Sequence, residues 1–404
     1  MNDTDKMDKI DEIGVQWRAA RNILAVRLDN LGDVLVTTPA IHAIKTTLPD
    51  SKITLFASPM GAQVGQLNPD IDDVLVYSAP WMDPWHKLPQ DSQREQQMIA
   101  AVKERQFDGA IIFTSYHESS LPAAYLCYLA DIPLRIAASI DGSGSLLTTR
   151  HKHPERMMHE VERGLDLVGV IGMTTDERDL VLQVPETART EVQKLFDNYK
   201  VNRSGLLIIV HPGCSMPART YPWEMYTAVI HELIRELDAT VILTGTEDER
   251  ALVERIMDKL RLWQDDAQAI PLAGELSFPN LCALIEAADC TITNNTGPMH
   301  ISAAVKTPVV ALFALTNPPQ QWGPWQIPHR LLNHNVPCRI CYSRVCPYQH
   351  ECLTLVSPSM VLNAVVDLLQ IPDIYQRNTA STSGRHIRGI MKVAQPEGKE
   401  GTCL

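Results

Sequence analysis

The chain has 404 residues, of which 45% are hydrophobic and 21% charged, and its formal net charge is −12. These values are typical of a folded globular protein that is long enough for two domains. The acidic balance argues against nucleic-acid binding, because neutralising phosphates takes an excess of Lys and Arg. The polar start resembles no signal peptide, and no stretch approaches the roughly 20 apolar residues of a membrane span. We therefore expect a cytoplasmic protein that contacts the inner face of a membrane, if at all, only peripherally.

The first half of the chain alternates strand and helix patterns. Short apolar runs predict strands at residues 23–28, 53–57, 74–77 and 109–113. One helix is expected directly after residue 30, and others at 93–105, 121–129 and 158–170. Loops are expected over 78–94 and 139–155. Buried strands that alternate with helices form parallel sheets covered on both faces. This pattern predicts a Rossmann-like domain over residues 21–185, after a polar extension at 1–20.

The second half repeats the same alternation. Strands are predicted at residues 206–210, 239–243, 290–293 and 309–313, and helices at 186–199, 223–237, 247–260, 279–288 and 299–305. A second Rossmann-like domain is therefore expected over residues 186–372. Residues 373–404 are polar and show no periodicity, so we expect a disordered tail. The predicted fold class is α/β, with two facing domains built on parallel sheets.

The segment from Arg27 to Asp33 joins the first predicted strand to a helix. Asn30 and Gly32 break the apolar pattern there, and Gly32 has no side chain to crowd an approaching ligand. Ligands of α/β proteins bind where strands end in such turns. Asp33 is then either a charge that stabilises the helix N-terminus or a general base. Arg27, Asn30 and Gly32 are candidates for supporting this loop or an acceptor.

Three predicted strand ends of the second half carry polar groups, at residues 211–219, 244–249 and 294–300. The last of these turns opens a helix, and the free N–H groups of such a helix start bind phosphate readily. Thr296 adds a hydroxyl, His300 adds a donor, and Arg219 could supply a cation. The same turn also fits an ordinary helix cap, which leaves two interpretations open.

The order of these motifs resembles glycosyltransferase family 9, the heptosyltransferases of lipopolysaccharide core synthesis. The resemblance covers roughly residues 21–370, and its motifs are Arg-x-Asp-x-x-Gly-Asp at 27–33, His-Pro-Gly at 211–213, Tyr-Pro-Trp-Glu at 221–224, Asn-Asn-Thr-Gly-Pro-Met-His at 294–300 and Thr-Pro-Val-Val-Ala-Leu-Phe at 307–313. It implies a GT-B fold and a metal-independent, inverting transfer from a nucleotide sugar. The implied donor is ADP-heptose, and the implied acceptor is a hydroxyl of the lipopolysaccharide core or another lipid-linked or free glycan.

The resemblance also implies roles for individual residues. Asp33 matches the catalytic base, and no cofactor is needed for catalysis. The donor phosphates would meet Arg219, Asn295, Thr296, Gly297 and His300, and the nucleoside would lie near Gly245 and Glu247. The chain departs from the family at Asn295, where Asp is usual, and at Arg219, where Lys is usual. Both replacements keep hydrogen-bonding capacity, so phosphate binding is expected to survive.

A cysteine cluster lies late in the chain, at Cys338, Cys341, Cys346 and Cys352. Four thiols can satisfy a tetrahedral zinc ion, and part of the family carries a similar stretch. Structural or redox thiol pairs and simple packing are the alternatives. A second local feature is the basic stretch at residues 150–159, which fits either a solvated loop or a surface for an anionic acceptor.

Two other functions remain open at this stage. One is a GT-B nucleotide-sugar epimerase, although the sequence offers no clear set of additional acid–base groups. The other is a non-catalytic protein that binds a nucleotide sugar or serves as a scaffold. Asn295 gives the second alternative some weight, whereas the retained Asp33 argues against it, since a binding module needs no base.

Overall fold

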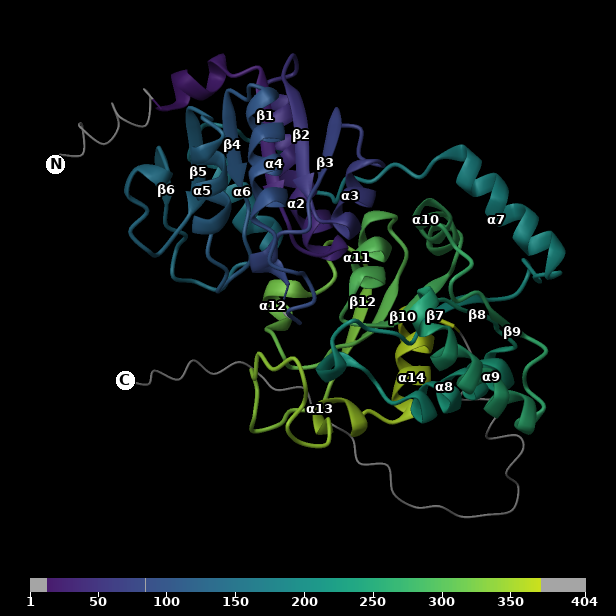
Figure 1. Cartoon of the computed structure of the whole chain (residues 1–404). Helices are drawn as coiled ribbons and strands as arrows, with labels where there is room; N and C mark the ends of the chain where they lie inside the picture. The colour runs from purple at the N-terminus through teal and green to yellow at the C-terminus, as the bar shows by residue number, and fades with distance from the viewer. Residues whose placement is uncertain (1–12, 84, 372–404) are drawn as a thin grey trace. The chain divides into compact units, whose positions relative to one another are not determined.

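Two six-stranded sheets organise the chain, one in each half of the sequence (Figure 1). The computed structural model describes residues 13–83 and 85–371. Every strand pair in both sheets is parallel, which confirms the α/β class. The first sheet runs in the order β3 (Asp73–Val76), β2 (Lys52–Ala57), β1 (Asn22–Arg27), β4 (Gly109–Ile112), β5 (Leu134–Ala138) and β6 (Thr149–His151). The second runs in the order β12 (His329–Leu332), β11 (Val309–Leu312), β10 (Cys290–Asn294), β7 (Leu207–His211), β8 (Thr240–Leu243) and β9 (Ala269–Pro271).

The two sheets share one topology. Within each sheet the first strand in sequence lies beside the second on one side and beside the fourth on the other. The strand order therefore reverses between β1 and β4 in the first sheet and between β7 and β10 in the second. Open α/β sheets bind ligands beyond the carboxyl ends of the strands at such a reversal. The turns that follow these four strands are thus the places to look for a site.

Helices connect the strands. Those of the first half are α2 (Leu31–Thr47), α3 (Pro59–Gly65), α4 (Ser92–Glu104), α5 (Leu121–Leu129) and α6 (Glu160–Gly169). Those that follow are α7 (Glu186–Asn198), α8 (Trp223–Leu237), α9 (Arg250–Trp263), α10 (Phe278–Glu286), α11 (Gly297–Ala304), α12 (Pro319–Trp322), α13 (Glu351–Thr354) and α14 (Pro358–Leu368). Single 3-10 turns lie at Pro80–Met82, Gly144–Leu146, Pro217–Arg219 and Glu247–Glu249. In the described part of the chain, no helix combines the length and apolar character needed to cross a membrane.

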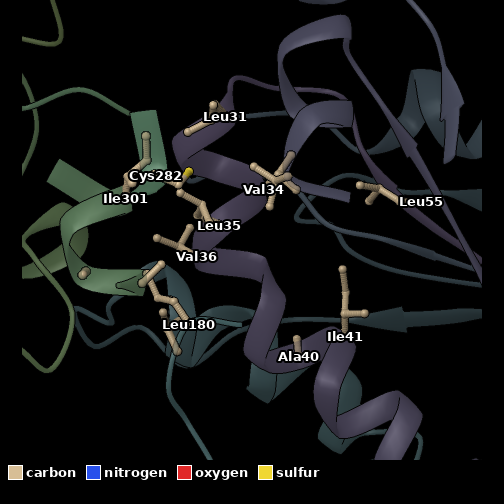
Figure 2. Packing of buried hydrophobic residues seen from close by; sticks show 14 of the residues in the cluster. Leu31, Val34, Leu35, Val36, Ala40, Ile41, Leu55, Leu180, Cys282 and Ile301 are labelled. Carbon is tan, nitrogen blue, oxygen red and sulfur yellow. The ribbon is translucent and has the colours of Figure 1, made fainter. Parts of the chain in front are cut away.

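Helix α2 is buried on nearly all sides, and this explains its uniformly apolar sequence. It contacts α3 and α6 of its own half and also α11, which follows β10 of the second sheet. Figure 2 shows Leu35 and Val36 on the side of α2 that faces Ile301 of α11 and Cys282 of α10. One continuous apolar core therefore joins elements of both halves, and it carries the starts of α2 and α11 close together.

The structure corrects several predicted elements. The strands β5, β6, β9 and β12 were not expected from the sequence, and β6 lies inside the predicted loop 139–155. These strands are three to five residues long, lie at or next to the sheet edges and carry charged residues or proline, so their apolar signal is weak. The predicted helix 247–260 begins as a 3-10 turn and becomes α-helical only at Arg250.

The start of the described chain is helical and packs against the first sheet. Residues 13–19 of the predicted polar extension are helical, and Trp17 is fully buried over Gly109. The predicted tail 373–404 lies outside the described residues. The contacts group residues up to Leu369 into one compact unit, so the domain boundary near residue 185 stays a prediction.

Candidate active site

Arg27, the last residue of β1, is buried at the centre of a polar cluster. Its Nη2 donates to Ser115 Oγ at 2.8 Å and to Asp33 Oδ1 at 3.3 Å, and its Nε lies 2.9 Å from Asp29 Oδ2. Burial alone would lower the pKa of this guanidinium, but the surrounding carboxylates outweigh it and raise the pKa. These carboxylates belong to Asp29, Asp33, Glu118 and Glu160. Arg27 is thus a permanent cation that organises the turns after β1 and β4.

Asp33 lies in the first turn of α2, where its carboxylate meets three donors, one of them the hydroxyl of Ser115, whose Oγ lies 3.5 Å from Oδ1. Oδ2 accepts a hydrogen bond from the backbone N–H of Asn30 at 3.2 Å, and Oδ1 accepts from Arg27. The side chain keeps 16% of its surface exposed, whereas that of Arg27 keeps 2%. Asp33 therefore caps the helix and is also held in a fixed orientation with access to solvent, so both interpretations of the sequence describe part of its environment.

Asp29 and Glu118, the carboxyl groups near Asp33 and Arg27, both have raised pKa values. Burial raises the pKa of Asp29 well above its ordinary range, and Arg27 only partly opposes this effect. Burial likewise raises the pKa of Glu118, whose Oε2 accepts a hydrogen bond from the N–H of Ser115 at 2.8 Å. The charge of the nearby Glu118 raises the pKa of Asp29 further. The pair therefore retains a proton more readily than isolated carboxyl groups do.

Gly32 and His300 bring the starts of α2 and α11 together. A Cβ added to Gly32 would lie 2.7 Å from His300 Cδ2, closer than real atoms approach. His300 is 5% exposed, and burial lowers its pKa to about 3, with the positive charges of His159 and Arg219 adding to the effect. The imidazole is therefore neutral at pH 7, and its buried Nδ1 has no hydrogen-bond partner. His300 can offer a hydrogen bond to a ligand but no charge.

Arg219 supplies the cation that the sequence suggested. Its Nε donates to Thr316 Oγ1 at 3.0 Å, and among the described residues no carboxylate forms an ion pair with it. Burial lowers its pKa, an effect that the thiol of Cys214 and the carboxylate of Asp33 partly offset. Arg219 is thus a largely buried cation without a counter-ion, close enough to Asp33 to feel its charge.

The turn between β10 and α11 is held by two asparagines. Asn294 accepts from the N–H of Tyr221 at 3.0 Å and donates to the carbonyls of Pro212 and Gly213 at 2.9 and 3.1 Å. Asn295 donates to Asn317 Oδ1 and accepts from the N–H of Ala314, both at 3.2 Å. The amide of Asn295 therefore bonds to neighbouring loops of the protein. This placement makes it a support for the turn that any bound phosphate would meet.

The other predicted phosphate ligands lie at the start of α11. Thr296 is the N-cap residue, its side chain makes no capping bond to the helix, and its hydroxyl interacts with the thiol of Cys214. Gly297 begins the helix, and a Cβ there would touch only Leu31 at 3.4 Å. The structure thus brings Thr296, Gly297 and His300 together on one short helix.

The residues predicted to lie near the nucleoside are Gly245 and Glu247. Glu247 is exposed and pairs with Arg250 through bonds of 2.9 and 2.7 Å, so its charge is already neutralised. Glu249 instead points inward, where it accepts from the N–H of Thr246 at 2.8 Å and blocks any side chain at Gly213. Gly245 is also in close contact with Glu249. The Thr246-x-x-Glu249 spacing of a capping box could have identified this residue from the sequence.

Four further residues of the site escaped sequence reasoning, namely Ser115, Glu118, Glu160 and Thr316. Ser115 and Glu118 follow β4, so the predicted strand 109–113 and the topological reversal beside β1 would have indicated them. Glu160 begins α6 and accepts a hydrogen bond from Gln321. No local sequence pattern predicts this contact. Their positions depend on which helices pack against β1.

The cysteine loop adjoins this cluster. Cys341 N–H donates to the carbonyl of Leu315, and the neighbouring Tyr342 N–H donates to that of Thr316, which also binds Arg219 through its hydroxyl. The eight described cysteines are all free thiols. Burial raises the pKa of Cys352, and the thiols of Cys338, Cys341 and Cys346 raise it further, so the four groups are neighbours. Among the described residues, no three of these sulfur atoms come within 4.8 Å of one another, which is wider than the spacing around a bound zinc ion.

The histidines of the basic stretch at residues 150–159 already have hydrogen-bond partners within the protein. His151 and His153 both contact Asp166, and His159 bonds through Nε2 to the carbonyl of Gly323 at 2.9 Å. Burial lowers the pKa values of His153 and His159. His153 and His159 therefore contribute little positive charge to the surface at pH 7.

Known proteins match both the sequence and the fold. The sequence pattern of glycosyltransferase family 9 (heptosyltransferase) matches residues 96–352. Lipooligosaccharide heptosyltransferase 2 of Campylobacter jejuni is 28% identical over 345 residues, 84% of this chain and 96% of that protein. Lipopolysaccharide heptosyltransferase 3 of Escherichia coli is 26% identical over 295 residues, 73% of this chain and 82% of that protein.

A solved structure extends the match to the whole fold. The ADP-heptose lipopolysaccharide heptosyltransferase II of E. coli superposes with a TM-score of 0.69 at 20% identity, covering 86% of this chain and 98% of that one. At this identity the likeness shows the fold alone, and it confirms the GT-B arrangement of two parallel sheets. The family pattern covers more than half of the length of this chain. The chain therefore belongs to glycosyltransferase family 9 and is a glycosyltransferase of the heptosyltransferase type.

Proposed function

We propose that this protein transfers a heptose, with inversion, from ADP-heptose to a hydroxyl of a lipopolysaccharide core or a related glycan. The observation that carries the proposal is the relation between Asp33 and Arg219. Asp33 is an oriented, accessible carboxylate, and Arg219 is a cation that forms no ion pair with the other described residues; the charge of Asp33 acts on Arg219. Transfer from a nucleoside diphosphate sugar needs this combination of a base and a stabilised leaving group.

Asp33 is the proposed base. The acceptor hydroxyl attacks the anomeric carbon as the bond from that carbon to the diphosphate oxygen breaks, and the hydroxyl proton passes to the carboxylate of Asp33. Arg27 and the N–H of Asn30 each bind one carboxylate oxygen and so prevent the side chain from rotating away. A positioned base of this kind contributes roughly 10²- to 10⁴-fold to a rate.

The leaving diphosphate gains negative charge as the bond breaks. Arg219 would neutralise this charge, and the backbone N–H of Gly297 with the positive end of α11 would bind the phosphate oxygens. Neutral His300 would add a hydrogen bond through a ring N–H. Because these groups are already in place before the reaction, they stabilise the transition state without reorganisation.

No metal enters this mechanism, since Arg219 and α11 supply the positive charge. A structural zinc ion held by Cys338, Cys341, Cys346 and Cys352 is a separate proposal. It would fix the loop that contacts Thr316 and thereby the position of Arg219. Binding would require the four sulfur atoms to draw together and lose their protons. A peripheral contact with the membrane, where a lipid-linked acceptor would lie, is likewise proposed from the relatives' substrates.

Calorimetry with ADP, UDP and GDP, each in the presence of EDTA, tests the donor assignment directly. ADP binding at least tenfold tighter than that of UDP or GDP would support the proposal. The release of ADP from ADP-heptose is then followed with and without a heptose-deficient lipopolysaccharide core. Preference for another nucleotide would replace the donor, and the absence of any nucleotide binding would contradict a transferase function.

A further inference from the structure

A cluster of two histidines and one aspartate lies on the first sheet, apart from the groups assigned to the transfer reaction. His151 is the last residue of β6, His153 follows two positions later, and Asp166 lies on α6. Oδ2 of Asp166 is 2.6 Å from His151 Nε2 and 2.6 Å from His153 Nδ1. One nitrogen of each ring and this oxygen all lie within 4.8 Å of one another.

The backbone holds the two imidazoles so that they converge. Residues two apart on extended chain point to the same side, which places His151 and His153 over the same part of α6. Their rings are perpendicular, at 90°, with centroids 4.9 Å apart. Arg150, which directly precedes His151 in β6, donates from its guanidinium to the carbonyls of Ser139 and Ile140. These bonds tie β6 to the loop that follows β5.

We propose that His151 Nε2, His153 Nδ1 and a carboxylate oxygen of Asp166 bind one divalent transition-metal ion. Two imidazole nitrogens and one carboxylate oxygen form a donor set that suits zinc and other first-row divalent metals. The three side chains are between 10% and 27% exposed, so water can reach the remaining coordination positions. The ion takes the place of the protons that otherwise join both rings to one oxygen.

Only a small movement separates the observed arrangement from a bound one. Ligand bonds of about 2.1 Å place neighbouring donor atoms about 3.4 Å apart around a tetrahedral ion, so each nitrogen must move away from the oxygen by somewhat less than 1 Å. Arg163 is the cation that faces His153, and its charge is offset by Glu160, whose Oε1 lies 3.2 Å from its Nε.

The metal would act as a brace and would take no part in the transfer reaction. It joins the end of β6 to α6, the helix that carries Glu160 and Arg163. His153, Glu160 and Arg163 line a cavity of about 10 Å³ together with Arg27, room for a single water molecule. The site thus stiffens one wall of the cluster around Arg27, and its existence does not depend on the proposed donor or acceptor.

Zinc binding to the full-length protein, stripped with EDTA, tests the proposal by calorimetry and by the rise in Tm. We compare the wild type with Asp166→Asn and His153→Gln, and with His231→Gln as a matched control. His231 Nδ1 lies 2.5 Å from Asp265 Oδ2 in a similar pair that lacks the second imidazole. We expect one zinc equivalent to weaken at least tenfold in the first two variants and to persist in the control. Equal zinc binding by all four proteins would overturn the proposal.

A second measurement separates this site from the cysteine cluster and needs no variant. After the thiols are blocked with N-ethylmaleimide, the wild type is titrated with Co²⁺. Nitrogen and oxygen ligands give weak visible bands without the intense near-ultraviolet band of cobalt–thiolate bonds. Uptake of one equivalent with this spectrum supports the His–His–Asp site, and no uptake by the blocked, folded protein contradicts it.

Discussion

Gly32 lies directly against the imidazole of His300, and this contact joins the helix that follows β1 to the helix that follows β10. The same two helix starts carry the proposed base and the proposed phosphate site. Since only a hydrogen occupies the position of Cβ at Gly32, the two helices approach more closely than any other residue would permit. The separation between base and leaving group therefore depends on a glycine.

Replacing Gly32 by Ala should destabilise the protein and slow transfer. The added methyl overlaps His300 Cδ2, and overpacking of this kind costs about 1–3 kcal/mol. Gly169→Ala in α6 is the matched control, because a Cβ there meets no atom within 4 Å. Urea unfolding measures both variants. Equal stability of the two would show that α2 and α11 adjust to the methyl freely.

Arg27→Gln should cost roughly 3–5 kcal/mol of unfolding free energy, because it leaves several buried carboxyl groups without their cation. The side chain of Arg27 is 2% exposed and lies among Asp29, Asp33, Glu118 and Glu160. Chemical denaturation at pH 7.5 measures the loss. The prediction further states that acidification partly restores the variant, since protonation removes the repulsion among the carboxylates. A variant as stable as the wild type at pH 7.5 would contradict it.

Arg219→Gln, unlike Arg27→Gln, should weaken nucleotide binding without lowering stability. No carboxylate of the described residues forms an ion pair with this cation, so its removal leaves no paired charge behind, and stability should remain unchanged or rise. ADP binding should instead weaken by about 10- to 100-fold, the value of one to two charged hydrogen bonds. Arg219→Lys serves as the control that keeps the charge. Unchanged ADP affinity in the Gln variant would exclude Arg219 from the phosphate site.

Asp33→Asn should reduce kcat by about 10²- to 10⁴-fold and leave ADP affinity within about twofold. The amide has nearly the same shape but cannot accept the acceptor proton in the transition state. Asp50→Asn, at an exposed position outside the site, controls for the loss of one negative charge. The measurement combines steady-state ADP release with calorimetry. Retention of more than a tenth of the wild-type kcat would rule out Asp33 as the base.

His300 should make stability fall as the pH decreases. Burial lowers its pKa in the folded protein from the ordinary value of 6.5 to about 3. Below pH 6.5 the unfolded chain therefore takes up a proton that the folded protein refuses, and unfolding becomes more favourable until the pH drops below about 3. Between pH 7.5 and 5.5 the wild type should lose about 1.4 kcal/mol more than His300→Gln. Exposed His334→Gln is the control, and identical pH profiles for all three proteins would contradict the prediction.

Much of the fold could be predicted because buried parallel strands have a strong local pattern. The strands β1, β2, β4, β7, β8, β10 and β11 are short apolar runs followed by turn residues, and the turns after β1, β7 and β10 carry the recognisable motifs. The edge strand β6 was missed because its residues, Thr-Arg-His, have no apolar signal. Its pairing with β5 depends on the sheet that already exists beside it.

The site shows the same division. The positions of Asp33, Arg219, Thr296 and Gly297 near strand ends and helix starts could be predicted, because such turns have fixed places in an α/β fold. The partners of Asn295, the inward position of Glu249 and the convergence of His153 on Asp166 could not. Each of these contacts joins side chains whose meeting depends on loop paths and helix packing.

Apolar periodicity was sufficient for the class of fold, because strand, turn and helix propensities act over a few neighbouring residues. The family followed from the resemblance of motifs spaced along the chain, which also indicated the turns of the candidate site. The tertiary structure alone decided that four carboxyl groups surround Arg27, that no carboxylate in the described part of the chain forms an ion pair with Arg219, and that His300 is neutral. The charge state of a group depends on its burial and on charges brought close by distant parts of the chain. Those distances exist only after α2, α6 and α11 have packed together.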